Sequence, residues 1–132
     1  MRYEFDAAIP AAALADLRQS VGWNRMEQDL ADSRLHNAFH LACFDENLLA
    51  GYAAVISNGV TDAYIQDLMV HPDYQKQGVG RQLMQQVLQR LRNEGIYMVS
   101  VIYGCAELQK YYEELGFTTM LCGQMELRPE RD

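Results

Sequence analysis

The feature that most constrains the fold is a glycine-containing loop, residues 71–81, between an apolar run that ends at Val70 and a stripe of apolar residues at helical spacing. Gly78 and Gly80 remove side chains where a ligand would touch the backbone. The amides that open a helix carry positive partial charge, which suits a phosphate, and Lys76 and Arg81 add two cations. The plainer interpretation is that the glycines only make a tight turn. Either interpretation predicts a strand, a loop and a helix in succession.

Two common nucleotide-binding loops do not fit this segment. A dinucleotide fingerprint needs a third glycine three residues after Gly80, where this chain has Leu83. It also needs an acidic residue at the end of the next strand, and the run Tyr97–Ile102 ends without one. A P-loop would continue with Gly-Lys-Ser or Gly-Lys-Thr. A dinucleotide oxidoreductase and a P-loop nucleotidase are therefore disfavoured.

Hydrophobic periodicity predicts the remaining elements. Strands are expected at residues 2–5, 39–44, 48–57, 63–70, 97–102, 117–121 and 124–127. Helices are expected after Pro10, at residues 26–35, from about 80 to the glycine at 95, and at 107–115. In the strand 63–70, Ile65, Asp67 and Met69 are expected to face one side. The order β-α-α-β-β-β-α-β-α-β-β indicates an α/β (α+β) fold with a mixed sheet.

Length and charge narrow the class of function. A chain of 132 residues with 49% hydrophobic residues is expected to form one domain, residues 1–132. The net charge of -7 argues against nucleic acid or anionic membrane as a general partner. Cys43, Cys105 and Cys122 lack the spacing of a metal or redox motif, and no signal peptide or spanning segment is recognisable. We expect a cytoplasmic, soluble protein without a metal.

Two motifs resemble one family in the correct order. The run Gln75-x-x-Gly78-x-Gly80 is similar to the pyrophosphate motif of the GNAT N-acetyltransferases. The run Tyr111-Tyr112-Glu113-Glu114-Leu115-Gly116-Phe117 resembles their late Phe-Tyr-Glu-Lys-Leu-Gly-Phe signature. The resemblance covers residues 48–121 well and the first 47 weakly. It implies a GNAT fold with a mixed sheet of about six to seven strands, in which the fourth and fifth strands splay apart.

The resemblance also implies acetyl-CoA as co-substrate and gives site residues. Backbone groups of Leu68, Met69 and Val70 would pair with the pantetheine arm. The pyrophosphate would lie on the loop residues Gln75, Lys76, Gln77, Gly78, Val79, Gly80 and Arg81. Tyr112 takes the position of the general acid, or it is simply a half-buried aromatic residue. Asp67 is the candidate base, or a carboxylate that only bonds a neighbouring strand or loop.

The acceptor is the least determined part. Trp23 and Arg25 lie between the first two expected helices, where relatives commonly build the acceptor wall, although Trp23 could instead plug the core. We expect an N-acetyltransferase that acts by direct attack of a primary amine, carried by a small molecule. Acetylation of a protein lysine or N-terminus, and a non-catalytic acyl-CoA sensor, stay open. The resemblance leaves a homodimer open as well.

Overall fold

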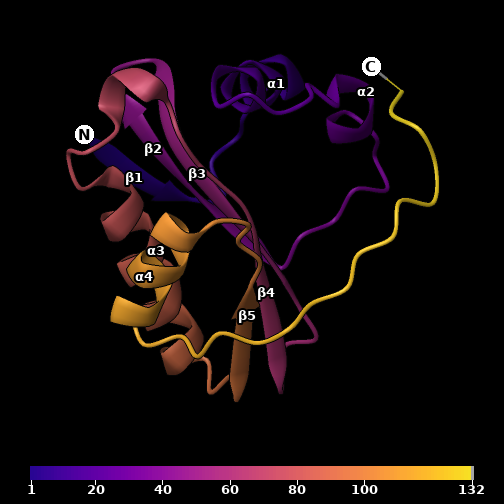
Figure 1. Cartoon of the computed structure of the whole chain (residues 1–132). Coiled ribbons are helices and arrows are strands. Elements are labelled where there is room, and N and C mark those ends of the chain that lie inside the picture. Colours follow the sequence, from indigo (N-terminus) through magenta and orange to yellow (C-terminus); the bar gives the residue numbers. More distant parts are fainter. Residues whose placement is uncertain (132) are drawn as a thin grey trace.

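The computed structural model describes residues 1–131 and contains one five-stranded sheet with helices on both faces (Figure 1). The strands, in their order across the sheet, are β1 (Arg2–Phe5), β2 (Phe39–Asp45), β3 (Leu48–Ser57), β4 (Asp62–Val70) and β5 (Met98–Val101). The helices are α1 (Ala11–Ser20), α2 (Glu27–Leu30), α3 (Val79–Asn93) and α4 (Ala106–Glu114), with a 3-10 turn at Pro72–Tyr74. Neighbouring strands are antiparallel except β4 and β5, which are parallel. The mixed α+β class is confirmed.

Two apolar clusters hold the helices to the sheet. Helix α3 buries one stripe at helical spacing, made of Val79, Leu83, Met84, Val87, Leu88 and Leu91. That stripe packs on a cluster that includes Leu41, Val55 and Ile65. On the opposite face, Leu17 of α1 packs with a second cluster that includes Tyr52 and Met69. The sheet is therefore covered on both sides, and its strands carry apolar residues on both faces.

A bulge in β4 changes which way its side chains point. Tyr52 pairs with Met69 but Ala54 pairs with Gln66, so β4 has one extra residue there. Asp67 takes up that residue with a left-handed φ of 56°. As a result Ile65 joins the cluster on the α3 side, whereas Met69 joins the cluster on the α1 side. The expectation that Ile65, Asp67 and Met69 face one way is wrong, because strict alternation cannot continue through a bulge.

The fourth and fifth strands separate halfway along. β4 pairs with β5 only from Asp62 to Ile65, opposite Met98 to Val101. β4 continues to Val70, so its second half extends beyond the last residue paired with β5. This divergence agrees with the splay that the resemblance implies, and it opens the sheet beside the glycine loop.

The second helix is shorter than expected. Helix α2 covers only Glu27–Leu30, where residues 26–35 were predicted. Met26 has a left-handed φ of 52°, so it cannot be the first residue of a helix. After α2, Asp32 Oδ1 accepts a hydrogen bond from the backbone N–H of Arg34 at 2.9 Å. Such a local side-chain bond competes with helical hydrogen bonds, which explains the early end.

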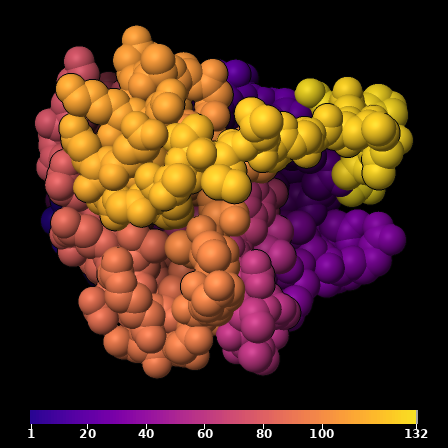
Figure 2. All heavy atoms as spheres, turned by 60° about the horizontal axis from the view of Figure 1, so that its bottom comes forward, coloured from indigo at the N-terminus to yellow at the C-terminus, as the bar shows by residue number. Residues whose placement is uncertain are grey.

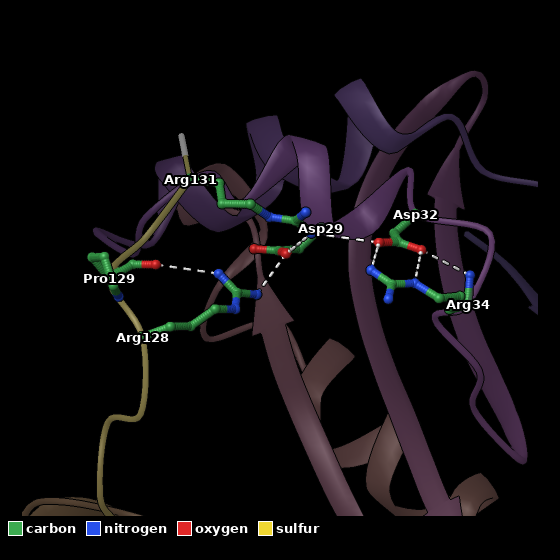
Figure 3. A network of polar contacts seen from close by, with 6 residues as sticks. All are labelled: Asp29, Asp32, Arg34, Arg128, Pro129 and Arg131. Carbon is green, nitrogen blue, oxygen red and sulfur yellow. Dashed lines mark hydrogen bonds and ion pairs between the residues drawn. The ribbon is translucent and has the colours of Figure 1, made fainter.

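The predicted C-terminal hairpin is wrong. Residues 117–131 contain no strand in the described structure, so the sheet has five strands where six to seven were expected. This segment, which we call the tail, leaves α4 and crosses the surface to α2 (Figures 1 and 2). There Arg128 and Arg131 both pair with Asp29 (Figure 3). The first residues of the tail, 117–122, line a cavity together with β5 and do not pair with it as a strand.

Among residues 1–131, no helix combines the length and the apolar character needed to cross a membrane.

Candidate active site

A groove of about 1000 Å³ lies where β4 and β5 diverge. Its walls come from the second half of β4, the glycine loop, the start of α4 and the loop after α1. The groove brings together most of the predicted site residues, namely Trp23, Asp67, Leu68, Met69, Val70, Gln75, Lys76, Gly78, Gly80, Arg81 and Tyr112. Arg25, Gln77 and Val79 do not line it. Residues that are distant in sequence therefore meet in one cavity.

The glycine loop forms an open cradle at the start of α3. Gly78 precedes the helix with a φ of 87°, and a Cβ added to it would meet nothing within 4 Å. The side-chain amide of Gln75 donates to the carbonyl oxygen of Val70 at 2.9 Å, which holds the loop against the end of β4. The first amides of α3 have no carbonyl partner within the helix. Exposed amides, absent side chains and the nearby Lys76 and Arg81 together fit a diphosphate.

Two predicted loop residues lie outside the groove for different reasons. The side chain of Val79 is buried in the core with only 3% exposed, so only its backbone can contribute to a site. The side-chain amide of Gln77 donates to the carbonyl oxygen of Asp73 at 3.2 Å and stabilises the preceding turn.

Tyr112 is buried in an aromatic cluster at the wall of the groove. It is 5% exposed, and its ring stacks on Tyr103 with centroids 4.8 Å apart. Tyr111 and Phe117 meet it edge-on, with centroids 5.1 and 5.8 Å away. Burial raises the pKa of Tyr112 to about 12, with smaller contributions from Tyr111 and Tyr103. The phenol is therefore fully protonated at neutral pH and can act as a hydrogen-bond and proton donor.

Asp67 forms an ion pair at the bulge of β4. Its Oδ2 lies 3.0 Å from a guanidinium nitrogen of Arg18, which comes from α1. Arg18 is itself buried, with 9% exposed, and donates 2.7 Å hydrogen bonds to both the backbone oxygen and Oδ1 of Asn24. Its guanidinium also lies 5.4 Å from the centroid of the Trp23 ring. One arginine thus connects α1, the loop that carries Trp23, and the bulge.

Arg18 does not line the groove but pairs with Asp67, which does, and the sequence analysis did not identify it. A signal was present, because Arg18 follows Leu14 by four residues and therefore lies on the apolar face of α1. A charged residue at such a position is rarely buried without a partner. The partner, Asp67, lies 49 positions further along the chain, and no spacing rule connects the two.

The two predicted acceptor residues have different surroundings. Trp23 is 41% exposed and lines the groove. Arg25 points elsewhere and bridges Asp16 and Glu27, each at 2.7 Å. Gln124 of the tail also lines the groove, so the tail supplies part of one wall. Beyond Gln124 the tail continues to α2, where Arg128 and Arg131 pair with Asp29 (Figure 3).

Comparisons with known proteins point to one family. The family model described as "Acetyltransferase (GNAT) family" matches residues 9–117. The uncharacterized N-acetyltransferase ycf52 of Gracilaria tenuistipitata var. liui is 32% identical over 120 residues, which cover 87% of this chain and 65% of that protein. This chain covers less than two thirds of the length of each of the first curated relatives that it matches.

Two solved structures have the same fold. The "Probable Acetyltransferase" of meticillin-resistant Staphylococcus aureus superposes with a TM-score of 0.80 at 21% identity, covering 97% of this chain and 100% of that one. The ribosomal-protein-S18-alanine N-acetyltransferase of Escherichia coli gives 0.74 at 21% identity, covering 91% of this chain and 80% of that one. With a family model that spans the glycine loop and the Tyr112 motif, the conclusion is direct: this chain belongs to the GNAT acetyltransferase family.

Proposed function

We propose that the chain transfers an acetyl group from acetyl-CoA to a primary amine of a small molecule, with Tyr112 as general acid. The observation that carries the proposal is the shared groove: the glycine cradle and a buried, protonated tyrosine line the same cavity. The cradle supplies a grip for an anion, and the tyrosine supplies a proton next to it. Membership of the GNAT family supports both roles.

The proposed cofactor site uses backbone more than side chains. Leu68, Met69 and Val70 lie in the part of β4 that extends past β5, and they line the groove. The amides from Gln77 through Arg81 would hold the diphosphate at the start of α3, with Lys76 and Gln75 beside them. Bound there, acetyl-CoA supplies an activated acetyl thioester and a thiolate leaving group. Local dipoles and cations thereby bind an anion to a chain whose net charge is -7.

Tyr112 is proposed to give the proton on Oη to the departing sulfur. A phenol with a pKa near 12 stays protonated until the thiolate develops beside it. Packing among Tyr103, Tyr111 and Phe117 fixes the ring at the wall of the groove. The phenolate formed by the transfer would then regain its proton from solvent.

The acceptor end of the groove suits an amine. Asp67 and Glu107 both line the groove, and carboxylates attract an alkylammonium. Asp67 stays our candidate for the base that takes the proton of the amine before attack. Its ion pair with Arg18 also supports the alternative that it only fixes the bulge. Trp23 offers an exposed ring against which an acceptor can pack. Arg25 is paired with Asp16 and Glu27, so we propose that it stabilises the loop that carries Trp23 and does not contact the acceptor.

The test is release of CoA thiol from acetyl-CoA across a panel of acceptors. The panel contains small primary amines, a peptide with a free N-terminus and a peptide with a single lysine. Turnover on small amines above either peptide supports the proposal. Turnover on a peptide alone would make the chain a protein acetyltransferase, and tight acetyl-CoA binding without thiol release on any acceptor would make it a sensor.

A further inference from the structure

The hydroxyl of Tyr111 stands out among the buried polar atoms of the protein. Its oxygen is buried and has no hydrogen-bond partner among residues 1–131. The hydroxyls of Tyr74 and Tyr103, by contrast, bond to Asp45 and Thr119. A buried hydroxyl without a partner costs stability, because it has lost its hydrogen bonds to water. A bound ligand could supply the hydrogen-bond partner that the protein does not.

The position of this hydroxyl indicates which partner it could have. A Cβ added to Gly80 would stand 3.9 Å from the Tyr111 oxygen and 3.5 Å from Cγ2 of Val70. Gly80 is the second residue of α3, so its amide is among the unpaired donors of the first turn. Tyr111, Gly80 and Arg81 all line the groove. A ligand atom resting on Gly80, in the space that a side chain would otherwise take, therefore approaches the hydroxyl.

The chemistry of the hydroxyl suits an anion. Burial raises the pKa of Tyr111 above its usual value, although Arg81 acts in the opposite direction. The phenol is therefore protonated at neutral pH and can donate to a phosphate oxygen.

We propose that the Tyr111 hydroxyl is a ligand-binding group that donates a hydrogen bond to the diphosphate of acyl-CoA at the start of α3. This inference rests on the proposed function, because it takes the glycine loop as the diphosphate site. It assigns to Tyr111 a role in binding and leaves the proton transfer to Tyr112. The two adjacent tyrosines then divide the work, one holding the co-substrate and the other acting on it.

The test compares Tyr111→Phe with the wild-type chain by calorimetric titration of CoA and of pantetheine, which lacks the diphosphate. We expect the dissociation constant for CoA to rise by roughly 10-fold, as for a lost hydrogen bond to a charged group. The affinity for pantetheine should not change. Tyr97→Phe is the matched control, because Tyr97 is 78% exposed and does not line this groove. It should bind CoA as the wild type does.

Thermal unfolding without ligand gives a second readout. Tyr111→Phe should melt at the same temperature as the wild type or higher, because it removes an unsatisfied buried hydroxyl. A lower melting temperature would show that the hydroxyl already has a partner in the protein and would overturn the inference. The inference would also be overturned if Tyr111→Phe and the wild type bound CoA equally well, or if Tyr111→Phe lost the same affinity for pantetheine as for CoA. In either case, CoA binding by the wild-type chain would leave the proposed function intact. A wild-type chain without affinity for CoA would overturn both.

Discussion

Tyr112 owes its chemistry to the rings around it. Its sequence motif indicates the position, but the raised pKa depends on burial against Tyr103, Tyr111 and Phe117, which come from the loop before α4, from α4 itself and from the residues after it. The sequence left open the alternative that Tyr112 is simply a half-buried aromatic residue, because the burial of a side chain depends on neighbours that are distant in sequence. At 5% exposed, the ring is a core residue that also lines the groove.

Tyr112→Phe should lower the turnover number by roughly 100-fold or more, as for loss of a general acid. The dissociation constant for acetyl-CoA should stay within about twofold, because no proposed cofactor contact uses this hydroxyl. Steady-state kinetics and calorimetry measure the two effects. Tyr103→Phe, which removes the hydroxyl of the stacked neighbour, is the control and should retain turnover. Normal turnover in Tyr112→Phe would rule out the acid role.

Arg18 pairs with a groove residue, Asp67, that only the three-dimensional structure brings close to it. Replacing it by methionine would leave the carboxylate of Asp67 half-buried and unpaired, with 22% of its side chain exposed. We expect the free energy of unfolding to fall by about 2 kcal/mol, less than for a fully buried pair. Urea denaturation measures this. Arg25→Met, which breaks the exposed pairs to Asp16 and Glu27, should cost less than about 1 kcal/mol.

A double substitution separates pairing from packing at this position. If the loss in Arg18→Met comes from the stranded carboxylate, then Arg18→Met with Asp67→Asn should recover part of it. Equal stability of the wild type and Arg18→Met would show that the ion pair does not hold the bulge.

At the scale of helices and strands, hydrophobic periodicity predicted the elements whose formation depends on their own sequence. The strand Leu48–Ser57 and the helix that begins beside Gly80 came out where the periodicity placed them, because each buries an apolar face along its own length. The bulge at Asp67 was not predictable, because it is a property of the pairing between β3 and β4. The prediction of a C-terminal hairpin was wrong for a similar reason. Alternation of polar and apolar residues indicates a strand, but the end of the tail lies on α2, where Arg128 and Arg131 pair with Asp29.

Asp29 is the carboxylate that both tail arginines share, and Arg131 also lies 3.6 Å from Oδ2 of Asp32. Arg131 and then Arg128 hold the pKa of Asp29 below its usual range, while burial acts the other way. Asp29→Asn removes the charge that both arginines share, so we expect the tail to detach more often and chymotrypsin to cut after Leu127 several-fold faster. Salt at about 0.5 M should speed cleavage of the wild type in the same direction.

Asp16→Asn is the control for the tail, since Asp16 is an exposed carboxylate that pairs with Arg25 and not with the tail. It should be cleaved at the wild-type rate. Identical cleavage of Asp29→Asn and the wild type would mean that the arginine pairs do not fix the tail.

For the whole molecule, buried tyrosines set the stability at high pH. Burial is the largest cause that raises the pKa of Tyr3, Tyr52 and Tyr112 from 10.0 to about 12. Between these values the unfolded chain loses protons that the folded chain keeps, so stability is full below pH 10 and falls as the pH rises towards 12. The urea midpoint, measured through this range, should decrease steadily. A midpoint that is constant up to pH 12 would contradict the burial of these phenols.

The central claim is that backbone amides exposed by two glycines bind a diphosphate on an acidic protein. The most direct measurement is calorimetric titration of CoA into the purified chain, with Gly78→Glu and Gly59→Glu beside it. Both glycines have positive φ and open space, at 87° and 80°, so the two variants carry similar backbone strain. We predict saturable binding at one site per chain for the wild type and for Gly59→Glu, and none for Gly78→Glu. A folded wild-type chain that does not bind CoA, or a Gly78→Glu variant that binds it equally well, would contradict the account.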